Sequence, residues 1–242
     1  MRRSRIYTPQ RLLPTGTIEL EGPASHYLLR VLRLSTGDAI TLFNGDDRNY
    51  QGEVCGVQRH RVNVSITGSE VPGMESPLKI TLVQAISRGE RMDYSLQKAT
   101  ELGVFCVQPL MSSRVEVRLD EKRQEKRLAH WQGVVTSACE QSGRALVPEV
   151  KTPLSLHEWM AANDGSPRLV LDPAAATRLS GFALKCDSVS ILVGPEGGFS
   201  AGEMDQVCAN GIQAVSLGSR VLRTETAGPA AIAVLQAQAG DL

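Results

Sequence analysis

The sequence has no apolar run that approaches the roughly 20 residues needed to cross a bilayer. Its basic amino terminus, MRRSRIYTPQ, is not followed by the apolar segment of a secretory signal, so we expect a cytoplasmic protein without membrane contacts. Low-complexity tracts are also missing, which argues against disorder. The 242 residues, 42% of them hydrophobic, allow one large domain or a small domain and a medium-sized one.

The cysteines and histidines do not have the spacing of metal ligands. The five cysteines are scattered, odd in number and without a CxxC pair. This pattern argues against a zinc site and against a disulfide framework, and it is typical of a reduced cytosol. The four histidines show no metal-ligand spacing either, so we expect no metal.

Net charge is +0, so the chain as a whole has no basic excess that would indicate nucleic-acid binding. The distribution is uneven, however, because residues 1–72 hold nine arginines, no lysine and seven acids. Arginine favours phosphate or base recognition, since its planar guanidinium binds pairs of oxygen atoms. An ordinary solvated surface explains the same distribution, so charge leaves both interpretations open.

Residues 1–72 have the pattern of a small β-rich domain. Short, partly alternating apolar segments are separated by turn signals such as STGD and NGDDRN, which predicts a small barrel or sandwich. The segment 24–34 has its apolar residues at helical spacing instead. Prolines and a glycine then mark residues 70–77 as a linker. The expected strands are 17–20, 38–44, 50–57 and 61–67.

From residue 78 to the end of the sequence, apolar strands alternate with helical segments, which predicts an α/β domain with a mostly parallel sheet. Ser155 and Glu158 have the spacing of a capping box at the start of one helix. The expected strands are 78–86, 104–111, 168–173, 188–194 and 214–218. The expected helices are 91–103, 120–142, 155–162 and two that begin near Ser200 and Thr224.

Three of these strand ends have unusual sequences, namely VLDP (170–173), VGPEGG (193–198) and SLGSRVLRTETA (216–227). Ligands of parallel sheets bind beyond the carboxyl ends of the strands. A single glycine-rich turn needs no ligand to explain it, because glycine permits positive φ and proline fixes a bend. Three such loops at one edge of the sheet indicate a binding site.

The middle loop does not fit a nucleotide phosphate. Its GxxGG pattern matches neither GxGxxG nor GxxxxGK[ST], and only 48 residues follow Gly194, too few for the rest of a dinucleotide-binding fold. Glu196 would also repel a pyrophosphate. The loop suits a ligand without phosphates, such as a cationic one, whose flat ring the backbone approaches closely.

The sequences LVGPEGGFSAGE and LGSRVLRTETA, with QKATELGV and CEQSGR upstream, resemble the RsmE family. RIYTP and HYLLRVLRL are similar to the amino-terminal domain of that family, so the resemblance covers essentially the whole chain. GPEGG alone is moderately specific, and GPEGG joined to LRTETA at this spacing is highly specific. Members of the family are SPOUT-class enzymes that methylate N3 of one uridine in bacterial 16S rRNA.

The resemblance implies an α/β fold in which a trefoil-knotted SPOUT methyltransferase domain with a mostly parallel sheet, 73–242, follows a small PUA-like, RNA-binding β-barrel domain, 1–72. It implies a cytoplasmic homodimer that uses S-adenosyl-L-methionine and acts in ribosome biogenesis on 16S rRNA of the small ribosomal subunit. The residues expected to bind the cofactor are Leu171, Gly194, Glu196, Gly198, Leu217, Gly218, Val221 and Leu222.

The loop that contains RTETA offers Arg223 and Glu225 for catalysis. Uracil N3–H is a weak acid, so we expect Glu225 to accept its proton and Arg223 to order the cofactor loop or to counter charge on the base. A structural explanation for Glu225 stays open, because an acid in the first turn stabilises a helix without any catalytic role.

Contacts with RNA are expected from five arginines: Arg5, Arg30, Arg33, Arg88 and Arg144. Gln141 and Ser142 are placed to contact RNA or a second subunit. The basic turn 122–127 is either a solvated helix face or a phosphate contact.

Two alternatives to the uridine enzyme stay open. A SPOUT methyltransferase could act on another RNA or atom, such as a ribose 2′-hydroxyl. A chain of the same fold could also be a non-catalytic RNA-binding assembly factor.

Overall fold

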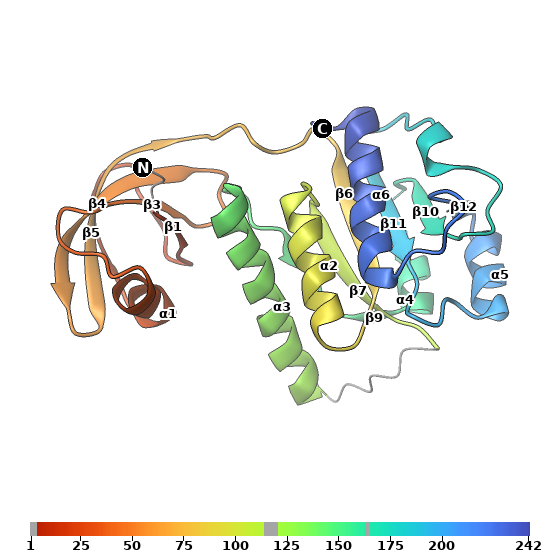
Figure 1. The fold of residues 1–242 in the computed structure, drawn as a ribbon, viewed down its shortest axis with the longest axis horizontal. Coiled ribbons are helices and arrows are strands. Elements are labelled where there is room, and N and C mark those ends of the chain that lie inside the picture. The colour runs from red at the N-terminus through yellow and green to blue at the C-terminus, as the bar shows by residue number, and fades with distance from the viewer. Residues whose placement is uncertain (1–3, 114–120, 163–164) are drawn as a thin grey trace. The chain divides into compact units, whose positions relative to one another are not determined.

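The computed structural model describes residues 4–113, 121–162 and 165–242 (Figure 1). The chain forms two compact units, which are Met1–Glu75 with Cys139–Val147, and Ser76–Ala138 with Pro148–Leu242. The predicted boundary between domains 1–72 and 73–242 and the boundary between the two units, after Glu75, both lie in the linker 70–77. The prediction did not include the segment 139–147 in the first unit, because periodicity gives no sign of which unit a short segment joins.

The first unit contains five strands: β1 (Ser4–Tyr7), β2 (Gly16–Leu20), β3 (Ala39–Phe43), β4 (Asn49–Gln58) and β5 (Arg61–Glu70). They form one sheet in the order β1-β3-β4-β5-β2, parallel between β1 and β3 and antiparallel elsewhere. Val62, Val64 and Ile66 are buried at alternate positions of β5, as the period of a half-covered sheet requires. Strands β2 to β5 confirm the four predicted strands.

The helix predicted over 24–34 is shorter and less regular than expected. α1 (Gly22–His26) passes directly into a π-helical turn, η1 (Tyr27–Val31). Arg33 has a positive φ of 54°, a conformation that cannot continue a right-handed helix. Leu28 is fully buried in the core of this unit, while Arg30 is exposed.

The second unit contains seven strands: β6 (Lys79–Ala85), β7 (Cys106–Met111), β8 (Glu149–Val150), β9 (Leu154–Ser155), β10 (Arg168–Leu171), β11 (Ser188–Val193) and β12 (Gln213–Val215). Their order is β12-β10-β11-β6-β7-β8, with β9 also paired to β7, and every pair of these described strands is parallel. The predicted parallel sheet is therefore confirmed.

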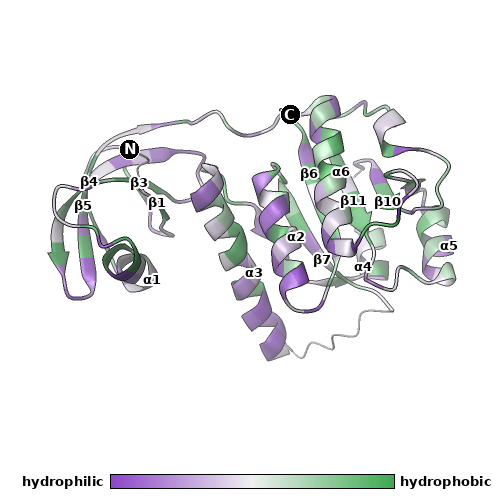
Figure 2. Ribbon diagram, in the orientation of Figure 1, coloured by the Kyte–Doolittle hydropathy of each residue, from purple (hydrophilic) through white to green (hydrophobic). Residues whose placement is uncertain are grey.

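Hydrophobic residues predominate in β11, a central strand of this sheet (Figure 2). Ile191, Leu192 and Val193 are consecutive in β11 and all buried, which happens only where both faces of a sheet are covered. The helices after β6 are α2 (Glu90–Glu101), α3 (Glu121–Ser142), α4 (Leu156–Ala161), α5 (Ala201–Ala209) and α6 (Thr224–Ala239), with a 3-10 turn, η2 (Leu179–Gly181), that contacts α6. α2 and α6 lie side by side (Figure 1).

The starts of two helices are fixed by capping boxes. In α4, the Ser155 hydroxyl accepts the Glu158 backbone N–H while the Glu158 carboxylate accepts the Ser155 N–H, as the sequence predicted. Ser200 and Glu203 make the same pair of bonds at the start of α5.

The order of the strands brings three loops together. β12, β10 and β11 are neighbours and parallel, so Leu171, Val193 and Val215 end at the same edge of the sheet. The loops that follow these residues are the three that the sequence marks as unusual. Parallel sheets bind their ligands at this edge, beyond the carboxyl ends of the strands.

Candidate functional site

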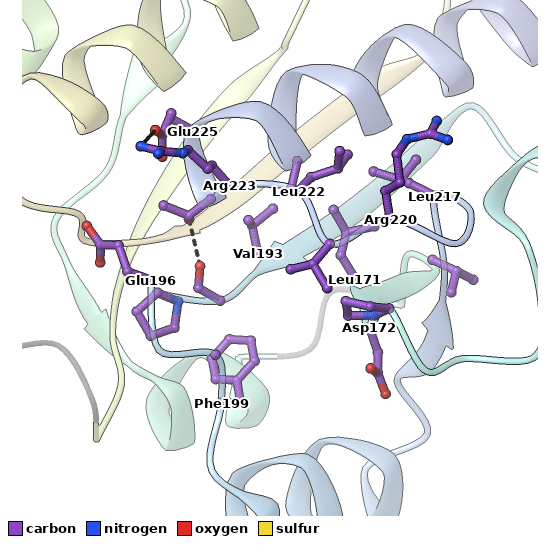
Figure 3. Close-up of a pocket in the computed structure, with 18 of the residues that line it drawn as sticks. Leu171, Asp172, Val193, Glu196, Phe199, Leu217, Arg220, Leu222, Arg223 and Glu225 are labelled. Atoms are coloured by element: carbon purple, nitrogen blue, oxygen red, sulfur yellow. Dashed lines mark hydrogen bonds and ion pairs between the residues drawn. The ribbon is translucent and has the colours of Figure 1, made fainter.

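The three loops enclose a cavity of about 500 Å³ within the second unit (Figure 3). Every residue predicted to bind the cofactor lines it except Gly218, and Arg223 and Glu225 line it as well. The other lining residues were not predicted: Arg91, Asp172, Pro173, Val193, Pro195, Phe199, Met204, Val215, Arg220, Thr224 and Ala227.

Apolar side chains from all three loops form the walls of the cavity. Leu171 ends β10, Val193 ends β11, and Leu217 and Leu222 belong to the loop after β12. Val221 also lines the cavity, and it is 82% exposed. Walls of this kind suit a flat, uncharged ring.

The loop between β11 and α5 depends on its glycines. A Cβ atom on Gly194 would lie only 3.2 Å from the ring of Phe199, so a larger residue would push that ring aside. Gly198 has a φ of +66°, which disfavours other residues, and its N–H donates to the Pro195 carbonyl at 2.9 Å. The turn therefore needs glycine for two different reasons.

Glu196 is held by the amino-terminal end of α2. One carboxylate oxygen accepts a hydrogen bond from Nη1 of Arg91 at 2.9 Å and from the backbone N–H of Arg88 at 3.3 Å. Burial alone would raise the pKa of Glu196, but these bonds and one from its own backbone N–H outweigh it and lower the pKa. Glu196 is thus a fixed negative charge beside the cavity.

Arg223 and Glu225 lie at the start of α6, where the third loop ends. Arg223 is the N-cap residue and its side chain is 78% exposed, whereas the Glu225 side chain is 15% exposed. Nη1 of Arg223 lies 4.0 Å from Oε1 of Glu225 (Figure 3). The catalytic roles of both residues stay predictions, because Glu225 is also a first-turn acid of the helix.

Thr224, between these two residues, is a part of the site that sequence reasoning missed. Its hydroxyl donates to the carbonyl oxygen of Gly194 at 2.7 Å and accepts from Nε2 of Gln84 at 2.9 Å. A threonine at a helix start is ordinary in a sequence, so nothing there indicated a bond to a residue thirty positions away.

The five arginines expected to contact RNA differ in their surroundings. Arg30, Arg33 and Arg88 are exposed. Arg144 is 4% exposed and forms a bidentate ion pair with Glu75. An RNA contact from Arg144 stays a prediction, and it would require this pair to open.

Arg5 is also engaged within the first unit. Its guanidinium donates to Oδ1 of Asn49 at 2.6 Å and to the Arg144 carbonyl at 3.0 Å, and it lies 4.9 Å from the centre of the Phe43 ring. Burial lowers the pKa of Arg5. These contacts give Arg5 a packing role, and its RNA contact stays a prediction.

The CEQSGR motif contributes to the core of the first unit. Cys139 is fully buried with Phe43 and Ala145, and burial raises the pKa of its thiol to about 12, so it is not a reactive thiolate. The Glu140 carboxylate accepts the backbone N–H of Tyr7 at 3.0 Å. Cys139 and Glu140 of the motif therefore have a packing role in the first unit.

Metal-binding clusters and membrane-spanning helices are both absent from the described residues. No three histidine, cysteine, aspartate or glutamate side chains gather into a possible metal site among residues 4–113, 121–162 and 165–242. None of the helices in those ranges is long and apolar enough to cross a membrane.

Family models match both parts of the chain. The model of an RNA methyltransferase domain matches residues 74–236, and that of an RNA methyltransferase PUA domain matches residues 20–67. These matches confirm the predicted combination of a PUA-like domain and a methyltransferase domain.

Relatives and solved structures match over nearly the full length. Ribosomal RNA small subunit methyltransferase E of Buchnera aphidicola subsp. Schizaphis graminum is 35% identical over 98% of this chain and 97% of that protein. The crystal structure of the enzyme of the same name from Neisseria gonorrhoeae, bound to S-adenosyl methionine, has a TM-score of 0.93 at 39% identity. A Legionella pneumophila methyltransferase in complex with that cofactor has a TM-score of 0.96 at 39% identity.

Both solved structures are covered completely and cover this chain completely. The residues that first suggested the resemblance, GPEGG and LRTETA, form the loops of the cavity. The chain therefore belongs to the RNA methyltransferase family that includes ribosomal RNA small subunit methyltransferase E.

Proposed function

We propose that this protein transfers a methyl group from S-adenosyl-L-methionine to N3 of one uridine in 16S rRNA of the small ribosomal subunit. The observation that carries the proposal is the 500 Å³ cavity, which is formed by the three loops that resemble the family's cofactor loops. Family membership supports the reaction class and the rRNA substrate. The choice of N3 and of one uridine rests on the resemblance.

The chemistry of the cavity fits this cofactor. Leu171, Leu217 and Leu222 offer apolar faces for an adenine ring, and the glycines of the 194–198 loop let the backbone come close. Asp172, Glu196 and Glu225 supply negative charge for a cation without phosphates. When bound, the sulfonium group of the cofactor supplies an activated methyl group.

The protein's own tasks are then to position the uracil and to remove the N3 proton. Glu225 is the carboxylate that we assign to proton removal, because it lines the cavity and its side chain is shielded from water. Arg223 is exposed beside it and can counter negative charge that develops on the base.

The same proposal includes RNA docking, assembly and location. We assign RNA docking to the first unit, where Arg30 and Arg33 are exposed, and to Arg88 next to the cavity loops. A homodimer, a trefoil knot in the second unit and a cytoplasmic location alongside the ribosome follow from the family resemblance and belong to the proposal.

The two alternatives make different products. A SPOUT enzyme of another specificity would methylate a ribose 2′-hydroxyl or a different base, and an assembly factor would bind RNA without turnover. The complete set of cavity loops favours an enzyme over a factor without activity.

The decisive experiment is mass spectrometry of nucleosides from small-subunit RNA after incubation with the protein and isotopically labelled cofactor. The subunits should come from cells that lack the endogenous enzyme. We expect labelled 3-methyluridine and no other labelled nucleoside. A labelled 2′-O-methyl nucleoside would support the first alternative, and absence of label despite RNA binding would support the second.

A further inference from the structure

Thr224 links the two loops that form most of the cavity, and Gln84 links both to the centre of the sheet. Gln84 belongs to β6, Gly194 directly follows β11, and Thr224 is the first residue of α6. The hydroxyl of Thr224 lies 2.9 Å from Nε2 of Gln84 and 2.7 Å from the carbonyl oxygen of Gly194. One hydroxyl thus joins three segments that are far apart in sequence.

The Gln84 amide and the Gly194 carbonyl together determine which group donates and which accepts in these hydrogen bonds. Gln84 Nε2 also donates to the carbonyl oxygen of Ala85 at 3.1 Å. Because a carbonyl only accepts, the amide nitrogen of Gln84, and not its oxygen, must point toward Ala85 and Thr224. Gly194 likewise offers only a carbonyl oxygen to the hydroxyl. The Thr224 hydroxyl therefore accepts from Gln84 and donates to Gly194.

Gln84 has a buried oxygen atom that is unpaired in the described chain, and its hydrogen bond to Thr224 explains why a glutamine is present at this position. Its side chain is fully buried, and its Oε1 has no hydrogen-bond partner among the described residues. An unpaired buried polar atom destabilises a fold, and an apolar residue at this position in β6 would avoid that cost. The bond that the amide donates to Thr224 gives a reason for a glutamine there.

Gly194 is held from two sides. The ring of Phe199 lies so close that a Cβ on Gly194 would be 3.2 Å from it, and the Thr224 hydroxyl holds the carbonyl. Gly194 and Thr224 both line the cavity, and Leu222 lies two residues before Thr224 in the third loop. The Thr224 hydroxyl thus forms a direct hydrogen bond between the two loops at the cavity.

We propose that Thr224 is a positioning residue for the cofactor cavity, whose hydroxyl holds the 194–198 loop and the loop before α6 at the separation that S-adenosyl-L-methionine requires. This inference rests on the proposed function. Thr224 contacts neither the sulfonium nor the uracil in the proposed mechanism. It contributes to cofactor binding through the shape of the cavity.

The test compares Thr224→Val with Thr224→Ser by calorimetric titration of S-adenosyl-L-methionine. Valine keeps the shape of the side chain but removes both hydrogen bonds, so we expect the Kd to rise about tenfold. Serine keeps the hydroxyl, so its Kd should stay within about threefold of the wild type. Adding Gln84→Met to Thr224→Val should change the Kd little further, because the link is already broken.

Thr100→Val is the matched control. The Thr100 side chain is fully buried and its hydroxyl donates to the Leu96 carbonyl within α2 at 2.8 Å; neither residue lines the cavity. Its loss should lower the unfolding midpoint and leave the Kd unchanged. If Thr224→Val does not fold, Gln84→Met alone serves as the test and should raise the Kd.

The outcomes separate this inference from the proposed function. A wild type that binds the cofactor, with Thr224→Val or Gln84→Met binding equally well, would overturn the role of Thr224 and leave the function standing. A wild type that does not bind S-adenosyl-L-methionine at all would contradict the proposed function itself. An equal rise in Kd for Thr100→Val would show that general loosening explains the effect, which also overturns the inference.

Discussion

Two carboxylates at the cavity have different surroundings, and this difference assigns them different roles. Glu196 accepts hydrogen bonds from Arg91 and from the Arg88 N–H, and its pKa is lowered. The Glu225 carboxylate is 4.0 Å from its charged neighbour Arg223, beyond hydrogen-bond distance. Hydrogen-bond donors that stabilise the ionised form of Glu196 make it a poor proton acceptor. Glu225 is therefore the better candidate for the general base.

At the residue scale, we predict that Glu225→Gln lowers single-turnover methylation at neutral pH by roughly 10²–10⁴-fold, the usual effect of losing a general base. Cofactor affinity should change little, because glutamine keeps the size of the side chain. The rate of the variant should recover as alkali ionises uracil N3 without help. The measurement is the methylation rate across pH at saturating cofactor.

Glu158→Gln is the control for this prediction, since Glu158 is a first-turn acid of α4 outside the cavity and glutamine also suits a capping box. Its methylation rate should equal that of the wild type. If Glu225 only stabilises α6, its substitution should cost a few tenths to about 1 kcal/mol of unfolding free energy with turnover nearly unchanged. That result would leave solvent as the proton acceptor.

At the scale of elements, the start of α5 determines where the middle loop ends. Ser200 and Glu203 form a capping box, and the Glu203 carboxylate also accepts the backbone N–H of Ser113 at 2.7 Å. Burial alone would raise the pKa of Glu203, but hydrogen bonds from Ser113 and Ser200 lower it below its usual value. Phe199 and Met204 flank this cap and both line the cavity.

We therefore predict that Ser200→Ala lowers the free energy of unfolding by about 0.5–2 kcal/mol and also weakens cofactor binding about threefold. Ser155→Ala removes the same kind of cap from α4, where neither the capping residues nor the residues beside them line the cavity, and should cost similar stability without affecting the cofactor. Denaturant titration and calorimetry on both variants check this. Equal cofactor affinity in the two variants would mean that the α5 cap does not shape the site.

At the scale of the whole molecule, the first unit is more than the amino-terminal part of the chain. Phe43 packs with Cys139 and Ala145, and Glu75 pairs with Arg144. Deletion of residues 1–72 would expose the buried side of this later segment, so loss of RNA binding by a truncated chain would be ambiguous. Substitution of exposed arginines in the intact protein is the cleaner experiment.

We predict that Arg30→Gln with Arg33→Asn weakens binding to small-subunit RNA and reduces the slope of log affinity against log salt by roughly one for each phosphate that an arginine no longer neutralises. Asparagine suits the positive φ at residue 33, so the fold should be kept. Arg48→Gln, an exposed arginine on the turn before β4, is the matched control and should leave the slope unchanged. An unaltered slope in the double variant would exclude η1 and the residues after it from the RNA surface.

The sequence by itself determined the features that depend on neighbouring residues. Strand periodicity predicted β2 to β5 and, in the second unit, β6, β7, β10, β11 and β12, but not the two-residue strands β8 and β9. The Ser155–Glu158 spacing predicted a helix start. The glycine-rich loop after Val193 and the RTETA loop indicated a ligand site, because backbone conformation and turn chemistry are local properties. Recognition of the family added the cofactor and the substrate.

Only the tertiary structure decided which distant residues meet. It joined the segment 139–147 to the first unit, buried Arg144 against Glu75, and brought the Thr224 hydroxyl to the Gly194 carbonyl. The local pattern around an arginine or a threonine is the same whether its partner is water or a residue that is 69 or 30 positions away. Such pairs are set by the packing of strands and helices over the whole chain, and local sequence carries no record of them.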